Sequence, residues 1–137
     1  MIRRDFLQAE IAKLTQALAK ILGLKNAGKV QEADDLISKS LLQDFDLTVD
    51  ELIPLNADQF KLLLSIKNFP AQKLDLLSQF LWESVSPFQP KPETTAVLNH
   101  VLTIYQLLEQ EHHTQSFENL SRKRSIIQFL EQHNAHG

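Results

Sequence analysis

The chain has 137 residues, of which 43% are hydrophobic and 23% charged, a length and composition typical of one soluble domain. It contains no cysteine, which excludes disulfides, thiolate zinc sites, iron–sulfur clusters and cysteine nucleophiles, and leaves the redox compartment open. The formal net charge of -3 argues against dedicated nucleic-acid binding, because such proteins are usually basic overall or over one face. Apolar runs span only a few residues, such as Leu62 to Leu64, so we expect no membrane span.

Residues 1–29 carry more positive than negative charge. Polar side chains such as Glu10 and Gln16 interrupt every apolar run, so this segment does not predict a secretory signal, and we expect a cytoplasmic protein. A basic amphipathic helix can also attach to an anionic membrane surface, which is one alternative function. The basic residues are Arg3, Arg4, Lys13, Lys20, Lys25 and Lys29.

The chain is expected to be helical throughout, because glycine is rare and alternating β-branched runs are absent. Gly23 is predicted to end the first helix in a left-handed conformation, and the turn 26–28 leads into a second helix. The two helices predict an antiparallel hairpin over residues 1–46. The apolar arc of the first helix comprises Phe6, Leu7, Ile11, Leu14, Ala17, Leu18, Ile21 and Leu22, and the stripe of the second comprises Val30, Ala33, Ile37 and Leu41.

Residues 47–86 are predicted to form the central, most buried helices. Capping-box patterns at 48–51 and 56–59 indicate two helix starts. Over 57–68 apolar residues cover most of the helix circumference, so this helix is expected at the centre of the core. Pro70 opens the next helix, for which we predict an inward face of Leu74, Leu77, Leu81 and Val85 and an outward strip of Asp75, Gln79 and Glu83.

The proline-rich segment 86–92 predicts an ordered crossover loop. A C-terminal helical hairpin is expected over 92–133, with one helix beginning near Pro92 and a final helix over about 116–133. Lys123 intrudes into the apolar face of the final helix. The expected core residues are Val97, Val101, Ile104 and Leu108 in the first of these helices, and Leu120, Ile127 and Leu130 in the second.

The predicted fold is therefore all-α: a single domain of about six or seven helices in antiparallel hairpins. Its first hairpin matches half of a tetratricopeptide pattern, in Gly28-Lys29-Val30-Gln31-Glu32-Ala33 followed by Ile37 and Ser40. The preceding helix departs from the pattern at Lys20 and Ile21. Lys67 stands where a repeat period of about 34 residues would place a second small residue, so we expect a degenerate, tetratricopeptide-like bundle and not a solenoid.

The N-terminal part of the chain resembles a family of small uncharacterised bacterial all-helical proteins. The residues that carry the resemblance are Met1-Ile2-Arg3-Arg4-Asp5-Phe6, Leu18-Ala19-Lys20-Ile21-Leu22-Gly23-Leu24-Lys25 and Gly28-Lys29-Val30-Gln31-Glu32-Ala33. The resemblance is clearest over residues 1–45 and continues weakly over 60–82. It implies a tetratricopeptide-like helical domain from a bacterium, and it implies no activity and no catalytic or ligand residue.

Glu109 and His112 have a Glu-x-x-His spacing that can present two ligands to a metal ion from one helix. Metal sites of that kind need two such motifs and further inward carboxylates, and the sequence has one copy. The motif lies at a helix end beside His113, where histidine often caps carbonyl groups. Capping is therefore the preferred interpretation and no cofactor is expected; the remaining histidines are scattered, at His100, His133 and His136.

Four other features have both a structural and a functional interpretation. Glu10 is the one charge within the apolar arc, and a paired residue at its rim is favoured over a functional carboxylate. The run 122–124 is basic, and a solvated helix face is favoured over a phosphate contact. The PxxP pattern at 87–90 is interpreted as loop stiffness rather than as a peptide ligand. Trp82 points away from the apolar line of its helix, either as an interface anchor or packed under the proline-rich loop.

The leading hypothesis is a non-enzymatic helical module that binds a protein, a peptide or a second copy of itself. The apolar arc of the first helix is wider than one partner helix would cover, which favours a homodimer through this helix. The expected partner-binding residues are Phe6, Ile11, Leu18 and Trp82. The alternatives are a metal- or small-ligand-binding bundle enzyme using Glu109, His112 and His113, and peripheral membrane association through the first helix.

Overall fold

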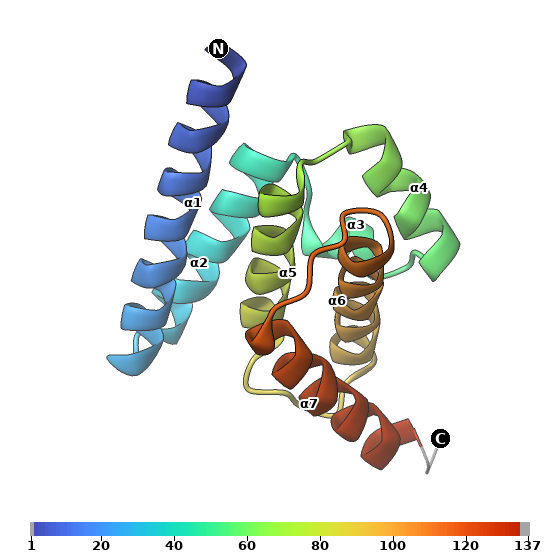
Figure 1. Ribbon diagram of the computed structural model, residues 1–137. Coiled ribbons are helices and arrows are strands. Elements are labelled where there is room, and N and C mark those ends of the chain that lie inside the picture. The colour runs from blue at the N-terminus through green and yellow to red at the C-terminus, as the bar shows by residue number, and fades with distance from the viewer. Residues whose placement is uncertain (1, 135–137) are drawn as a thin grey trace. The chain divides into compact units, whose positions relative to one another are not determined.

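The computed structural model describes residues 2–134, with side chains over residues 5–133. Met1 and His136 lie outside the described residues, as do the side chains of Arg3 and Arg4. The described chain contains seven α-helices and no strand, which confirms the all-α prediction (Figure 1). The helices are α1 (Ile2–Asn26), α2 (Val30–Ser40), α3 (Val49–Leu52), α4 (Ala57–Lys67), α5 (Ala71–Val85), α6 (Pro92–Gln110) and α7 (Phe117–Asn134), and a π-helical turn, Leu41–Phe45, follows α2.

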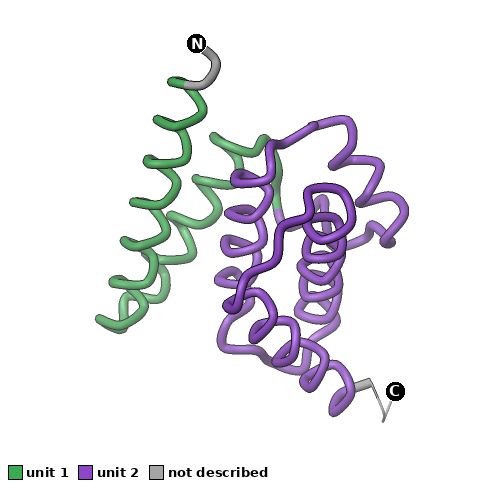
Figure 2. Tube along the Cα trace, viewed as in Figure 1, with its two compact units in different colours: residues 1–48 green, residues 49–137 purple. Residues whose placement is uncertain are grey.

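The chain divides into two compact units, residues 1–48 and residues 49–137 (Figure 2). The first unit holds α1, α2 and the π-helical turn, and the second holds α3 to α7. The unit boundary therefore falls close to residue 46, where the predicted hairpin ends.

In the first unit, α1 packs against α2, and the two helices run antiparallel, as the sequence predicts (Figure 1). The small side chains Ala33 and Ser40 are both buried on α2, which lets the helix backbones approach closely. Val30 of the predicted stripe is exposed, because it is the first residue of α2. The buried residues of this unit are Leu14, Ile21, Ala33, Ile37, Ser40, Leu41, Phe45 and Leu47.

The end of α1 differs from the prediction. Gly23 lies inside the helix, and the left-handed residue is Gly28, with φ of 77°. The Lys29 amide donates to the Leu24 carbonyl at 2.8 Å and the Gly28 amide donates to the Lys25 carbonyl at 3.0 Å. These two bonds form a Schellman motif, in which a residue without Cβ is favoured at the left-handed position. The helix continues past Gly23 because its next residues tolerate helical geometry and Gly28 offers the better stop.

In the second unit, α6 is the central helix, because it packs against α3, α4, α5 and α7. The prediction that the helix over 57–68 forms the centre is wrong: α4 buries only Phe60 and Leu64. A helix that packs on one side can bury only one stripe, whatever the apolar content of its other faces. The buried residues of α6 are Thr94, Val97, Leu98, His100, Val101, Thr103, Ile104, Tyr105 and Leu108, which include every core residue predicted for this helix.

Two other predicted faces are corrected by the packing around α6. On α5, Leu74, Leu77 and Leu81 are buried as expected, but Glu83 of the expected outward strip is also buried and Val85 is only half-buried. On α7 the buried residue is Ile126, while Leu120 and Ile127 of the expected core face are exposed. Consecutive residues of a helix point about 100° apart. A small error in the predicted direction of the buried face therefore replaces a buried residue by its exposed neighbour.

Candidate interaction groove

Helix α4 begins and ends at well-formed caps. The Asn56 side chain accepts a hydrogen bond from the Gln59 amide at 2.8 Å, and the Gln59 side chain accepts one from the Asn56 amide at 2.9 Å, which confirms the capping box at 56–59. At the other end Asn68 adopts a left-handed conformation, with φ of 55°, and its amide donates to the Leu64 carbonyl. The caps and the two buried anchors Phe60 and Leu64 account for the position of this helix.

The opposite side of α4 carries two large aliphatic side chains that take no part in the core. Leu62 is 63% exposed and Ile66 is 73% exposed. Residues four apart lie on the same helix face, so the two side chains form one continuous apolar ridge. We call Leu62 and Ile66 the α4 ridge.

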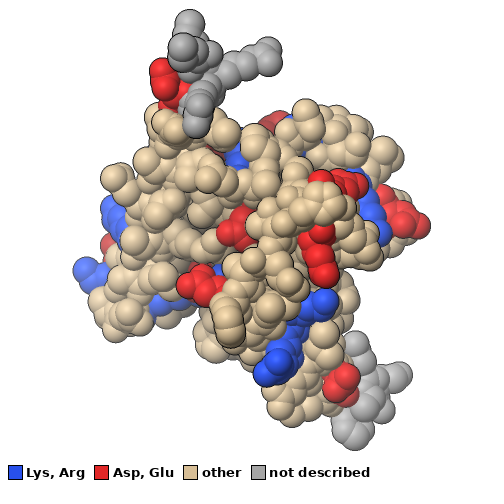
Figure 3. Space-filling view, in the orientation of Figure 1, with Lys and Arg blue, Asp and Glu red and all other residues tan. Residues whose placement is uncertain are grey.

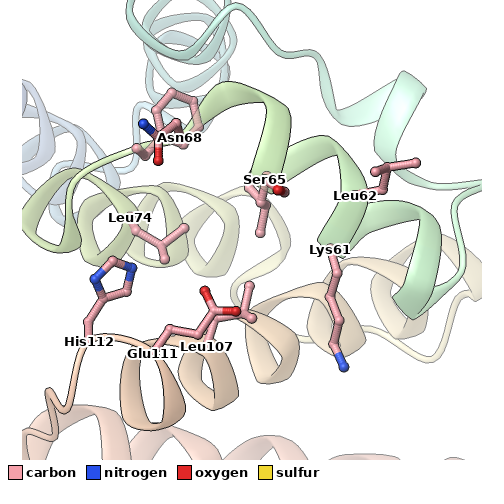
Figure 4. Close-up of a pocket in the computed structure, with 10 residues that line it drawn as sticks. Lys61, Leu62, Ser65, Asn68, Leu74, Leu107, Glu111 and His112 are labelled. Carbon is pink, nitrogen blue, oxygen red and sulfur yellow. The ribbon is translucent and has the colours of Figure 1, made fainter.

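A hollow of about 370 Å³ adjoins the ridge, between α4, the start of α5 and the C-terminal end of α6 (Figure 4). Leu62 belongs both to the ridge and to the wall of this hollow. The apolar lining is Leu62, Leu64, Phe69, Leu74 and Leu107, and the polar lining is Lys61, Ser65, Asn68, Glu111 and His112. We call this hollow the α4–α6 groove.

The charged residues of the groove lie toward opposite ends. Figure 4 shows Glu111 and His112 at the end of α6 and Lys61 on α4, with Leu107 between Glu111 and Lys61 and with Leu74 on the side of His112. Within the described residues, no ion pair or side-chain hydrogen bond engages the Lys61 ammonium or the Glu111 carboxylate. A hollow of mixed apolar and polar lining, with one unpaired cation and one unpaired anion, is suited to a partner that has a complementary pair of charges.

The candidate metal residues lie at the end of α6 and are all exposed: Glu109, His112 and His113. Only His112 lines the groove, beside Glu111. No group of three or more His, Asp or Glu side chains that could hold an ion occurs within residues 5–133. The role of His113 is a backbone one, because its φ of 52° is left-handed and the next residue, Thr114, returns a backbone bond of 2.8 Å to the Leu108 carbonyl.

Trp82 is half-buried on α5, where the proline-rich loop and α7 supply its surroundings. Its ring meets the Phe88 ring of the proline-rich loop edge-on at 4.8 Å between centroids, and the Arg122 guanidinium lies 5.3 Å from the Trp82 ring centroid. Phe88 also meets Phe129 of α7 at 5.3 Å. Packing under the loop is thus what the structure shows for Trp82, and this packing connects α5, the loop and α7.

Arg122 differs from its neighbours in the basic run, because Lys123 and Arg124 are exposed while Arg122 is half-buried beside Tyr105. Burial raises the pKa of Tyr105 to about 12, and the nearby Arg122 charge acts in the opposite direction. The expectation of a solvated face therefore holds for Lys123 and Arg124 alone. Figure 3 shows acidic and basic side chains scattered across one face of the molecule among uncharged ones.

The predicted partner-binding residues of the first helix lie in the first unit. Phe6 is 71% exposed, whereas Ile11 and Leu18 are half-buried. Phe6 lines a shallow hollow with Glu10, Lys13 and Asp44. The Lys13 ammonium pairs with the Asp44 carboxylate at 3.2 Å, so the partner of Lys13 comes from the π-helical turn. Trp82 belongs to the second unit, so these predicted residues do not form one site within either unit.

His100 is a buried polar residue that the sequence left without a role. It is 2% exposed, its ring lies 4.2 Å from the Phe60 ring, and it borders a second hollow of about 360 Å³. The sequence also does not predict the α4 ridge, because it places the whole helix over 57–68 at the centre of the core. The signal for it was the apolar run Leu62 to Leu64: consecutive helical residues point in different directions, so a helix packed on one side must expose part of such a run.

Comparisons with family models, with curated proteins and with solved structures found no match to this chain. The resemblance to small bacterial helical proteins and to the tetratricopeptide hairpin therefore stays a prediction. None of the described helices has the length and apolar character to cross a lipid bilayer.

Proposed function

We propose that the chain is a non-enzymatic helical interaction module whose protein partner docks on the α4 ridge and the α4–α6 groove. The observation that carries this proposal is the exposure of Leu62 and Ile66 on one face of α4, directly beside the groove. Single exposed aliphatic residues are common on protein surfaces. Two at helical spacing beside a hollow that is partly lined by Leu62, Leu64, Phe69, Leu74 and Leu107 provide an anchor arrangement like that of helix-in-groove recognition.

The ridge is available for binding because the Leu62 and Ile66 side chains are exposed and lie outside the core. Phe60 and Leu64 hold α4 in place, and the capping box and the Asn68 turn satisfy the helix ends. Covering one large aliphatic side chain stabilises a complex by about 1.5–3 kcal/mol before the costs of association. The ridge therefore supplies an anchor of useful strength without being needed for the core.

The surface on the first helix, with Phe6, Ile11 and Leu18, is a separate candidate that rests on the exposure of Phe6. On that surface Lys13 already forms an ion pair with Asp44. In the α4–α6 groove, Lys61 and Glu111 have no ion-pair partner among the described residues. This difference favours α4 as the binding surface. The enzyme and membrane-surface alternatives stay predictions, and no contact among the described residues favours either of them over the interaction module.

Site-specific photocrosslinking tests the proposal. A photoreactive amino acid replaces Ile66 in the full-length protein, and a matched protein carries it at Ile127, an exposed aliphatic position on α7. Irradiation in a lysate of the source cells is expected to give a discrete protein adduct from position 66, either heterologous or homotypic, and a much weaker one from position 127. Adding Leu107→Glu, which places a charge in the groove lining, should abolish the adduct. Equal labelling from both positions, or an adduct insensitive to Leu107→Glu, would contradict the proposal.

A further inference from the structure

We infer that the occupant of the α4–α6 groove is a second copy of this chain, related to the first by a two-fold axis that passes through the groove. The inference rests on the proposed function and names its partner. It has two independent grounds, the shape of the surface and the arrangement of its charges.

The shape of the surface is self-complementary. In a two-fold dimer each subunit uses the same patch, so the patch must contain both a projecting and a receiving part. The α4 ridge projects at Ile66, which is 73% exposed, and the adjoining groove receives. A two-fold axis lets Ile66 of each copy enter the hollow of the other, which covers both ridges at once.

The charges are self-complementary in the same sense. The groove carries one cation, Lys61 on α4, and one anion, Glu111 at the end of α6, and Leu107 forms the floor between them (Figure 4). A two-fold axis that runs parallel to that floor, at right angles to the line from Lys61 to Glu111, turns the two floors toward each other and places Lys61 of each copy opposite Glu111 of the other. Both groups are without an ion-pair partner in the described residues, so dimerisation breaks no existing pair. A groove with two like charges would repel its own copy.

Charge reversal in the full-length protein tests this arrangement. Sedimentation velocity over a concentration series compares the wild-type chain with Lys61→Glu, Glu111→Lys and the double variant. Each single variant is expected to raise the dissociation constant of the dimer about tenfold. A two-fold dimer contains two Lys61–Glu111 pairs, so each charge reversal creates two repulsive contacts. The double variant should recover to within about threefold of the wild type, since the pair is rebuilt with its charges exchanged.

Two controls make the outcome specific. Lys123→Glu on α7 changes the net charge as much as Lys61→Glu does and should leave the dimer unchanged, and circular dichroism shows whether each variant folds. A wild-type chain that stays monomeric at high micromolar concentration overturns the inference, as does a double variant no better than the weaker single one. If the chain is monomeric and position 66 still crosslinks specifically to another protein, the inference of a homodimer is wrong but the proposed function stands. If neither association nor specific crosslinking occurs, both the homodimer inference and the proposed function are wrong.

Discussion

The His100 imidazole donates a hydrogen bond from Nε2 to the carbonyl oxygen of Leu52 at 2.6 Å, which joins α6 to the last residue of α3 across 48 positions of sequence. A carbonyl can only accept, so the proton resides on Nε2 and Nδ1 is the unprotonated nitrogen. That Nδ1 is buried and has no hydrogen-bond partner among the described residues. His100 is therefore held in one neutral form, in a place where a second proton would meet no acceptor.

The first prediction is a loss of stability in mild acid that depends on His100. Burial lowers the pKa of His100 from 6.5, and the hydrogen bond to Leu52 opposes this only in part. The hollow that His100 borders has no charged side chain in its lining to stabilise the imidazolium. Below pH 6.5 the unfolded chain binds a proton that the folded chain does not, so the free energy of unfolding falls as the pH drops from 6.5 toward the lowered pKa and is fully retained above 6.5.

Urea unfolding at a series of pH values from about 5 to about 8, on the order of half-unit steps, measures this dependence. His100→Gln keeps an amide that can donate to Leu52 and removes the titration, so the variant should show a flatter profile than the wild type below pH 6.5. Parallel profiles for the two proteins would mean that His100 does not contribute.

The second prediction concerns two glycines with opposite roles. Gly23 lies inside α1, and no neighbouring atom lies within 4 Å of the position that a Cβ would occupy there, so Gly23→Ala should stabilise the protein by about 0.5–1 kcal/mol. Gly28 has φ of 77°, where an alanine is strained, so Gly28→Ala should destabilise it by about 1 kcal/mol. Denaturant unfolding of the two variants measures both free energies, and changes of the same sign would contradict the assigned end of α1.

The third prediction uses Trp82, the only tryptophan of the chain, as a reporter. Phe88→Ala removes the ring that covers Trp82 edge-on, so the fluorescence emission of Trp82 should shift to longer wavelength as the indole meets water. Phe117→Ala is the matched control, because Phe117 is 91% exposed and belongs to a different element. An unchanged emission maximum in Phe88→Ala, or the same shift in both variants, would contradict the packing of the proline-rich loop on α5.

Local signals in the sequence predicted local structure well. The capping box at 56–59, the helix start at Pro92 and the antiparallel hairpin of α1 and α2 all follow from neighbouring residues and are confirmed. The burial of particular faces was less predictable, because it depends on which helices lie on each side. Glu83 and Ile126 are buried and Ile127 is exposed for this reason. Periodicity identifies an apolar face and not the neighbour that covers it.

Because periodicity does not identify the neighbours of a helix, the sequence does not predict the α4–α6 groove. Leu62 and Ile66 have the residue type of a core, and only the position of α4 at one side of α6 makes them exposed. The residues that the sequence predicts to bind a partner lie on the first helix and at Trp82, and Phe88 and Arg122 pack against the Trp82 ring. A tryptophan that leaves the apolar line of its own helix can be packed by a loop that the helix pattern does not reveal.

The α4 ridge should serve association and not folding, and a charge placed on the ridge separates these two roles most directly. Sedimentation velocity of Ile66→Asp, against wild type and against Leu120→Asp on α7, measures association at matched concentrations, with the free energy of unfolding of each variant recorded alongside. We predict that Ile66→Asp sediments as a monomer and stays within about 0.5 kcal/mol of wild-type stability, since it alters an exposed side chain, while Leu120→Asp associates like the wild type. Wild-type association in Ile66→Asp, or its unfolding, would contradict a ridge used for association.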